Sequence, residues 1–254
     1  MTAATIAFDR EAPGYDEGFG RNPAGLVFRH AFQERLRALF APGARVVDLG
    51  CGTGEDALFL ASLGVRVHAV DLSPAMVERT RAKAARAGLA ERVTASVLAA
   101  ESVASLGDGF DGAYSDFGAL NCTALGTVGE GLARVLRPGA PLLLSVIGPW
   151  PLPALVGRAL FASGPFRRPV PDVGGVPVPI RHLTPAALRQ SLGPAFAWTD
   201  AWAQGVLLPG PMHERWIRRH PLAFGVMAAA ERAVRRWPGL RSLGDHAVVE
   251  GYRR

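Results

Sequence analysis

Through the middle of the chain, the spacing of apolar and polar residues alternates between patterns typical of strands and patterns typical of helices. Short apolar runs rich in β-branched residues predict five strands, over Arg45 to Leu49, Val65 to Val70, Arg92 to Leu98, Phe110 to Asp116 and Pro141 to Gly148. Longer segments with helical spacing lie between them, over Glu55 to Leu63, Pro74 to Ala87 and Leu125 to Leu136. Strand and helix alternating in this way are typical of a parallel sheet with helices on both faces. The pattern predicts a doubly wound α/β fold.

The flanking segments are less regular than this middle. A helix is expected from Asn22-Pro23 to Phe40, whereas Pro149 to Arg181 holds 8 of the 20 prolines and leaves room for a regular helix over Leu155 to Ala162 at most. The remaining predicted elements are a helix from Thr184 to Leu192, a strand from Phe196 to Leu208, a helical stretch from Met212 to Trp237 broken at Pro221, and a last strand from His246 to Tyr252. We expect one domain, made of an arm and helix (1–43), a cofactor-binding core (44–148) and a substrate cover with late helices and final strands (149–254).

Composition narrows the class of protein. With 49% hydrophobic and 20% charged residues among 254, the chain has enough apolar surface to fold as a globular protein. Met1 to Arg10 lacks the basic start and apolar centre of a secretion signal, and no run approaches the roughly 20 apolar residues that span a bilayer. We therefore expect a cytoplasmic protein. Its two cysteines, Cys51 and Cys122, are too few for a disulfide framework or a zinc site, and we infer no metal.

The net charge of +6 is concentrated near the C-terminus. Residues 211 to 254 contain 9 Arg against 4 Asp and Glu, which gives +5 for this stretch alone. Such a tail could face nucleic acid or a membrane surface. Charge runs are more often solvated faces, and that interpretation is preferred here.

The most informative run is Val-Val-Asp-Leu-Gly-Cys-Gly-Thr-Gly from Val46 to Gly54. A buried strand ends at Asp48, and glycines at every second position then let the backbone turn tightly and approach a ligand at a helix start. The dinucleotide fingerprint needs a glycine where this chain has Glu55, whose charge would repel a pyrophosphate. The loop therefore suits a nucleoside cofactor without phosphate. Asp71, directly after the second strand, supports this because a carboxylate there can accept hydrogen bonds from both hydroxyls of a ribose.

Taken together, four ordered motifs resemble the class I S-adenosylmethionine-dependent methyltransferases. They are the loop from Asp48 to Gly54, Val-Asp-Leu-Ser from Val70, Phe-Asp-Gly-Ala-Tyr-Ser-Asp from Phe110, and Leu-Arg-Pro-Gly-Ala from Leu136. The resemblance covers about residues 44 to 148 and, more loosely, 244 to 253, which look like the family's final antiparallel strand. It implies a Rossmann-like, mostly parallel seven-stranded sheet with an antiparallel last strand and helical insertions.

The resemblance also implies S-adenosyl-L-methionine as cofactor and assigns residues to it. Asp48 would hold the loop or the ammonium group, Asp71 the ribose, and Leu72 would lie beside the adenine. Glu101 would accept from the adenine amino group, although an ordinary exposed glutamate at a helix start is the equal alternative. The expected cofactor-binding set is Asp48, Gly50, Cys51, Gly52, Gly54, Asp71, Leu72, Glu101, Ser115 and Phe117.

Methyl transfer from a sulfonium needs mainly a nucleophile held in line, and a general base only when the attacking atom carries a proton. Base candidates are His182, then His213, Asp116 and Tyr15, with a surface or structural histidine as the alternative in each lone case. Tyr15 lies in a glycine-rich arm that is either a lid over the cofactor or a flexible terminus. We expect catalytic roles among His182, Asp116 and Tyr15, and substrate contacts among Asn121, Trp150 and His213.

The acceptor itself is not fixed by these motifs. Asp116-Phe-Gly-Ala lacks the Pro-Pro-aromatic motif of methyltransferases that modify amino groups of bases and glutamines. Apolar residues such as Trp150, Leu160 and Trp216 in the insertions could cover the strand tips and admit a small hydrophobic acceptor, or simply complete the core or a dimer contact. We predict methyl transfer to O, N or C of a small molecule, by a monomer or homodimer. Peripheral membrane contact could occur through Arg215, Arg218 and Arg219. The alternatives are an RNA methyltransferase, in which nucleic acid would contact the arginine-rich region, an NAD-dependent oxidoreductase and a non-catalytic cofactor-binding protein.

Overall fold

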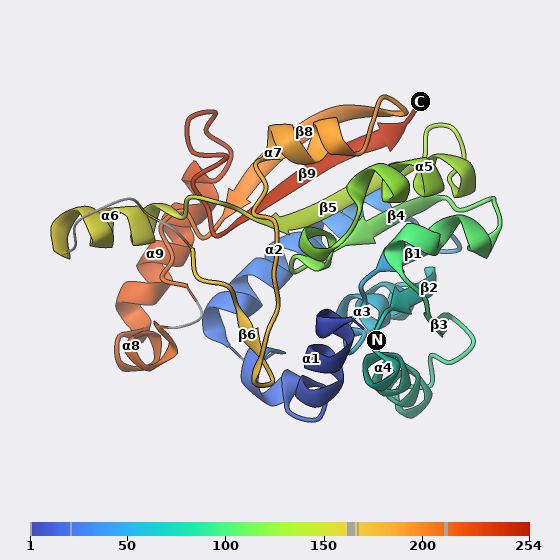
Figure 1. Ribbon diagram of the computed structural model, residues 1–254, viewed down its shortest axis with the longest axis horizontal. Helices are drawn as coiled ribbons and strands as arrows, with labels where there is room; N and C mark the ends of the chain where they lie inside the picture. The colour runs from blue at the N-terminus through green and yellow to red at the C-terminus, as the bar shows by residue number, and fades with distance from the viewer. Residues whose placement is uncertain (1, 21, 162–165, 167, 211–212) are drawn as a thin grey trace.

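A twisted seven-stranded sheet forms the centre of the computed structural model, which describes residues 2–20, 22–161, 166, 168–210 and 213–254 (Figure 1). The strand order is β3-β2-β1-β4-β5-β9-β8. The strands β1 to β5 pair in parallel, and β9 runs antiparallel to both of its neighbours. Their bounds are β1 (Arg45–Leu49), β2 (Arg66–Asp71), β3 (Val93–Val97), β4 (Gly112–Ser115), β5 (Pro141–Ile147), β8 (Phe196–Gln204) and β9 (His246–Arg253). The predicted fold class is confirmed.

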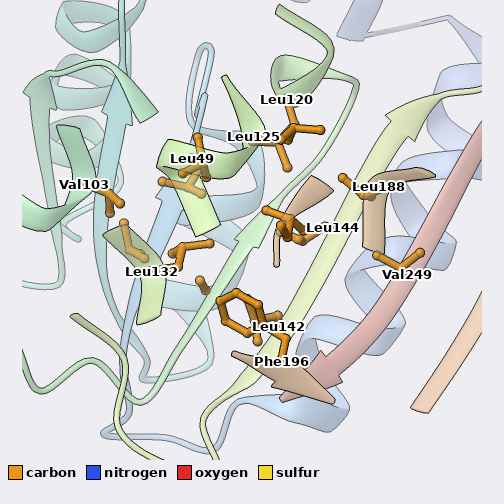
Figure 2. Close-up of a cluster of buried hydrophobic side chains, with 14 of the residues drawn as sticks. Leu49, Val103, Leu120, Leu125, Leu132, Leu142, Leu144, Leu188, Phe196 and Val249 are labelled. Carbon is orange, nitrogen blue, oxygen red and sulfur yellow. The ribbon is translucent and has the colours of Figure 1, made fainter. Parts of the chain in front are cut away.

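Helices cover both faces of this sheet, and most of its strands therefore contribute to two cores. One core joins Val46 and Leu143 to α2 (Pro23–Leu39), α3 (Glu55–Ser62) and α4 (Pro74–Arg86). The other joins Val47 and Leu142 to the 3₁₀ segment η2 (Ala100–Leu106), α5 (Leu125–Val135) and α7 (Pro185–Ser191), and Figure 2 shows it. Successive side chains of a strand point to opposite faces, which explains why these neighbouring residues enter different cores.

Three helices begin as their sequences predict. The side-chain oxygens of Asn22, Ser73 and Thr184 each accept a hydrogen bond from a backbone N–H in the first turn, at 3.0 to 3.2 Å. A proline follows each cap, where its missing N–H costs nothing. The core strands and helices accordingly start and end within a few residues of their predicted positions.

The flanks depart from the sequence-based expectation. The expected irregular arm contains a helix, α1 (Ala3–Glu11), and a π-helical turn, η1 (Asp16–Gly20). Helix α6 (Leu152–Phe161) begins before the predicted Leu155, because Pro153 falls in its first turn, where proline is tolerated. The predicted last residue of that helix, Ala162, lies outside the described residues.

Two further segments complete this part of the chain. A short hairpin, β6 (Asp172–Val173) and β7 (Val176–Pro177), was not expected and packs on α1. The expected break at Pro221 separates α8 (Glu214–Arg219) from α9 (Pro221–Val234), whereas Met212, the predicted start of this helical stretch, is not among the described residues. The described helices include none long and apolar enough to cross a membrane. The division into one domain with three parts stays a prediction.

The strand order brings several loops to one edge of the sheet. The chain leaves β1 toward β2 on one side and later returns to β4 on the other, which opens a crevice at the carboxyl ends of these strands. Because β9 is antiparallel, its first residue, His246, lies at this same edge, opposite Ile147 of β5 and Gln204 of β8. The loops after β1, β2, β4 and β5 therefore meet the start of β9.

Candidate active site

A cavity of about 1240 Å³ lies at this edge of the sheet. Its loop end is formed by residues at or after the ends of β1, β2 and β3. These are Gly50, Cys51, Gly52, Thr53, Glu55, Asp56, Asp71, Leu72, Ser73, Met76 and residues 98–101. Its chamber end is formed by residues from the end of β5, the proline-rich segment, the loop after β8 and the start of β9. These are Ile147, Pro151, Pro153, Ala154, Phe166, Arg168, Pro169, Pro171, Asp172, Val173, Val178, Pro179, Ile180, His182, Gly205, Leu207, Leu208, Pro209, Gly210, Asp245 and His246. Apolar side chains dominate the chamber end, among them Ile147, Phe166, Val178, Ile180 and Leu208. Side chains from α1 also contribute to the wall.

The glycine loop after β1 has its predicted tight conformation. Gly50, Gly52 and Gly54 all have positive φ, at +74°, +53° and +82°. A Cβ at Gly50 would lie 2.1 Å from Cβ of Ala119, and one at Gly54 would lie 2.7 Å from Cγ2 of Thr80. At Gly52 the nearest atom, in the Tyr15 ring, would be 4.0 Å away, so the backbone there faces open space. Gly50 and Gly54 therefore allow close packing, and Gly52 leaves room for a ligand.

Asp71 joins this loop to the next one. Its Oδ2 accepts a hydrogen bond from the Gly52 N–H at 2.9 Å, and its Oδ1 accepts one from the Ser73 N–H at 2.9 Å. Burial raises the pKa of Asp71, and these backbone donors oppose the increase. The carboxylate lies in the cavity wall, at the position from which it can also accept hydrogen bonds from a ligand.

Several buried carboxyl groups gather near this end. Burial and then the charge of Asp56 raise the pKa of Asp48 well above its usual value, and the same two causes raise that of Asp116 to about 7. Oδ2 of Asp116 is buried and has no hydrogen-bond partner in the described part of the chain. Arg29 of α2 lies 3.0 Å from Oδ2 of Asp56 and 4.6 Å from the Phe117 ring centroid. One guanidinium among these carboxyl groups leaves an environment that favours a cationic ligand.

The N-terminal arm folds against the glycine loop. The Thr53 hydroxyl donates to Oδ1 of Asp16 at 2.6 Å, and Nζ of Lys83 lies 2.7 Å from Oδ2 of Asp16. These contacts hold Tyr15 in the cavity wall, where burial raises the pKa of its hydroxyl. The Tyr15 ring is thereby placed opposite the open face of Gly52.

Most of the predicted site residues line the cavity. These are Tyr15, Asp48, Gly50, Cys51, Gly52, Asp71, Leu72, Glu101, Asp116, Phe117, His182 and His213. Leu72 exposes 38% of its surface, which leaves an apolar face free beside the loop. Glu101 also accepts a hydrogen bond from the Ala124 N–H at 2.8 Å, so its carboxylate has a structural contact as well.

Four predicted site residues are not brought to the cavity wall. Gly54 packs behind the loop against Thr80, and the Ser115 hydroxyl donates to the Leu49 carbonyl at 2.7 Å inside the sheet. The Asn121 amide donates to the carbonyls of Ile147 and Arg181 at 3.0 and 2.6 Å, and its Oδ1 accepts from the Ile147 N–H at 2.9 Å. The structure thus uses Asn121 to tie loops together rather than to face a substrate. Trp150 is 49% exposed and lies outside the lining.

The structure also reveals lining residues that the sequence reasoning missed. Arg29, Arg168, Asp245 and His246 all contribute to the wall. Sequence gave no signal for Arg29, whose guanidinium meets Asp56 only after α2 packs on α3. The expected antiparallel last strand could have pointed to His246, because the first residue of such a strand lies at the carboxyl edge of its parallel neighbours.

Comparison with known proteins agrees with this architecture. Residues 46–139, which contain β1 to α5 and the whole glycine loop, match the family model of a methyltransferase domain. Within this stretch the chain resembles the class I S-adenosylmethionine-dependent methyltransferases, as its ordered motifs predict. Among curated relatives, it is 31% identical to the O-methyltransferase resE of Aspergillus sclerotiorum over 50% of this chain and 51% of that protein. It is also 31% identical to the ubiquinone/menaquinone biosynthesis C-methyltransferase UbiE of Geotalea daltonii, over 54% of this chain and 60% of that one.

Solved structures extend the likeness from this stretch to the whole fold. The [4+2]-cyclase SpnF superposes with a TM-score of 0.67 at 19% identity, covering 100% of this chain and 97% of that chain. A putative sarcosine dimethylglycine methyltransferase from Galdieria sulphuraria superposes with a TM-score of 0.63 at 15% identity, covering 95% and 97%. The chain spans about half the length of the curated relatives it matches. Because proteins of this fold include one named as a cyclase, the fold alone does not define the reaction.

Proposed function

We propose that this chain transfers the methyl group of S-adenosylmethionine to a small, largely apolar acceptor. The observation that carries the proposal is one continuous cavity that joins the glycine loop and Asp71 to an apolar chamber. A cofactor held at the loop end would present its methyl group toward the chamber. The chain itself supplies mainly position, and holding two reactants in line can account for ~7 to 11 kcal/mol of rate acceleration.

Charge supports this cofactor over one that contains phosphate. S-adenosylmethionine carries a sulfonium and an ammonium group, and the buried carboxyls of Asp48, Asp56 and Asp116 favour positive charge nearby. We assign the ribose hydroxyls to Asp71 and the adenine to the exposed face of Leu72, and Arg29 is positioned to meet the carboxylate of the methionine part. When bound, the sulfonium supplies an activated methyl group.

Other functions receive less support from the site. A nicotinamide cofactor would bring its pyrophosphate against Glu55 and the buried carboxyls at the same loop. An RNA substrate would need the basic C-terminal region, but Arg218 and Arg236 form ion pairs and Arg253 donates to a backbone carbonyl. A cofactor-binding protein without transferase activity would have no use for an apolar chamber joined to the cofactor end.

Calorimetric titration of the full chain with S-adenosylhomocysteine and, separately, with NADH tests the cofactor. We expect measurable binding of the first and none of the second, and a preference for NADH would reject the proposal. A labelled-methyl screen over cell extracts treated or untreated with nuclease then tests the acceptor class. Transfer that survives nuclease supports a small molecule. Transfer abolished by nuclease would indicate RNA, and tight cofactor binding without any transfer would indicate the non-enzyme alternative.

As a partner for the chamber-end surface we propose an anionic membrane. Val156 and Leu160 of α6 and Leu222 and Val226 of α9 expose 48, 68, 86 and 72% of their surfaces, and the two helices lie at one end of the molecule (Figure 1). Ala154 of α6 and Met227 of α9 also line the chamber. The neighbouring helix α8 exposes Arg215 and Arg219. A basic and apolar surface beside a chamber opening fits an anionic bilayer from which an apolar acceptor could enter.

Vesicle sedimentation tests this partner. Phosphatidylglycerol vesicles should bind the chain more tightly than phosphatidylcholine vesicles, and Leu222→Asp with Val226→Asp should abolish the binding. The matched control is Val97→Asp. Val97 is half-exposed and lies at the end of β3, the outer strand on the side of the sheet away from β8. Equal binding of both vesicle types, or concentration-dependent dimerisation that the double variant removes, would instead favour a contact between two copies.

A further inference from the structure

His246 is held in a fixed position in the chamber wall. It opens β9 at the edge of the sheet where the cavity lies, and only 5% of its surface is exposed. Phe28 and Phe117 contact the imidazole edge-to-face, with ring centroids 5.7 and 5.8 Å away. Two aromatic rings on a buried imidazole leave it little freedom to rotate. The ring therefore keeps one orientation toward the chamber.

The two edges of this imidazole face different surroundings. Nδ1 is buried and lies 3.0 Å from Oδ2 of Asp245, which is an ion-pair distance, but among the described residues it has no partner that meets hydrogen-bond geometry. Because Nδ1 is covered, the part of the ring that reaches the cavity is the edge away from it. A carboxylate beside Nδ1 favours the tautomer with the proton on that nitrogen, which leaves the lone pair on Nε2.

Asp245 is itself held as an anion. NH2 of Arg168 lies 2.7 Å from its Oδ1, and NH1 of Arg168 donates to the Gly148 carbonyl at 2.9 Å. Although burial alone would raise the pKa of Asp245, His246 and Arg168 hold it well below its usual range. A permanent negative charge is therefore present beside Nδ1 whether the imidazole is neutral or protonated.

We propose that His246 takes the proton from the acceptor, that Asp245 is its positioning residue, and that the acceptor is an apolar molecule bearing a hydroxyl group. This inference rests on the proposed methyltransferase function. The hydroxyl oxygen bonds to the methyl carbon of the sulfonium donor, and the carbon–sulfur bond breaks with its electron pair remaining on sulfur. The O–H bond breaks and the proton passes to Nε2 of His246. The resulting imidazolium is stabilised by Asp245 and later loses its proton to water.

The surroundings favour a neutral hydroxyl over other reacting groups. A carboxylate acceptor has no proton to lose and would meet the charges of Asp245 and Asp116. Other charged groups near His246 are Arg168, which is paired with Asp245, and Arg29, which lies over the Phe117 ring. A hydroxyl is a poor nucleophile until its proton is accepted, and general base catalysis contributes typically ~10² to 10⁴-fold. A general base fixed in the cavity wall can therefore activate a hydroxyl acceptor by taking its proton.

His182, the base favoured by the sequence, lies in the same wall but is less constrained. It is partly exposed, and the described residues give it neither a hydrogen bond nor a ring contact. Burial and the positive charge of Arg168 lower the pKa of its imidazole, and Asp245 opposes this. His182 is therefore the rival base against which His246 is tested, because it is a histidine of the same chamber near the same charged pair.

The first test measures the His246 tautomer by NMR on the full chain labelled with ¹⁵N-histidine, with resonances assigned from His246→Gln and His182→Gln. We expect the neutral imidazole to carry its proton on Nδ1, and Asp245→Asn to remove this preference without changing the folded spectrum. With S-adenosylhomocysteine present, 1-naphthol should shift Nε2 of His246, whereas 1-methoxynaphthalene, which lacks the hydroxyl, should not. A proton on Nε2 in the unaltered chain, equal shifts from both probes, or no shift at His246 would overturn the assignment.

The second test uses whichever acceptor the labelled-methyl screen identifies. His246→Gln should lower kcat by ~10² to 10⁴-fold with unchanged S-adenosylhomocysteine affinity, while His182→Gln, which removes the rival base, should cause a far smaller loss. Comparable losses in both variants, or an acceptor that reacts through an amine or carbon without needing His246, would overturn the proposal. If the chain does not bind S-adenosylhomocysteine, the proposed function fails, whereas the tautomer measurement still reports on the His246–Asp245 pair.

Discussion

The two ends of the cavity differ in the charge they are built to receive. At the loop end, carboxyl groups outnumber the guanidinium of Arg29 among the described lining residues, and burial holds the pKa of Asp48 and Asp116 above their usual values. At the chamber end, Asp245 is neutralised by Arg168, and the remaining wall is mostly apolar. At the first end Oδ2 of Asp116 has no hydrogen-bond partner among the described residues, whereas at the second end the charge of Asp245 is balanced by Arg168. One fold can therefore hold a charged donor and a neutral acceptor side by side.

The largest effect should come from closing the loop end. Gly50→Ala combines a left-handed backbone with a Cβ 2.1 Å from Ala119, and the two sources of strain together amount to roughly 4 kcal/mol. The free loop can relieve this strain by moving away from Ala119, and binding would have to restore it, so we expect S-adenosylhomocysteine affinity to fall by up to roughly 1000-fold in calorimetry. Gly88→Ala, which has φ of +69° but no atom within 4 Å of its Cβ, is the matched control and should leave affinity unchanged. Equal losses would mean that loop packing does not form the site.

Removing the carboxylate that joins the loops should have a smaller effect. Asp71→Ala should weaken S-adenosylhomocysteine binding by roughly 10- to 150-fold, the scale of hydrogen bonds to a charged group of about 1.5 to 3 kcal/mol. Asp111→Ala is the control, because Asp111 also accepts a backbone hydrogen bond, from Arg45 at 2.8 Å, at the opposite edge of the sheet. Unchanged affinity for Asp71→Ala, with the fold intact by circular dichroism, would place the ribose elsewhere.

The smallest expected effect is a pH dependence of S-adenosylmethionine affinity. It distinguishes the loop end of the cavity from the chamber end most directly. The pKa of Asp116 is raised to about 7, so its carboxyl becomes ionised as pH rises from 6 to 8 and a nearby cation is then bound more tightly. We expect S-adenosylmethionine affinity to increase roughly threefold over this range, by a fraction of the ~1 kcal/mol expected for a screened charge pair. S-adenosylhomocysteine lacks the sulfonium charge and should change less. Asp116→Asn should remove the difference, and an equal pH dependence for both ligands would contradict the cationic role of the loop end.

Sequence predicted the parts of this protein that depend on local patterns. The strands from β1 to β5, the caps at Ser73 and Thr184 and the tight glycine loop all follow from residue spacing and backbone preference. Asp71 could be placed because the carboxyl ends of adjacent parallel strands meet at one edge. The fold and the loop end of the site were therefore accessible from sequence.

The chamber end was not accessible from the sequence, because its contacts join residues that are far apart in the chain. His246 meets Phe28 and Phe117, and Arg168 meets Asp245, only after β9 inserts beside β5. Asn121 illustrates the reverse error. An amide after a strand tip is typical of a ligand contact, but here the Ile147 and Arg181 backbone groups use it completely. No local pattern distinguishes an amide that faces a ligand from one that ties two loops together.

The contact of Lys83 with the arm has a practical consequence. Lys83 is the only lysine in the chain, and its ammonium group is held against Asp16 and Glu55 beside the glycine loop. Lys83 is therefore the one side-chain amine that an amine-reactive reagent can modify. It becomes accessible when its ion pair with Asp16 breaks. The rate of Lys83 modification, measured with and without a ligand in the cavity, would therefore report how often the N-terminal arm moves away from the cavity.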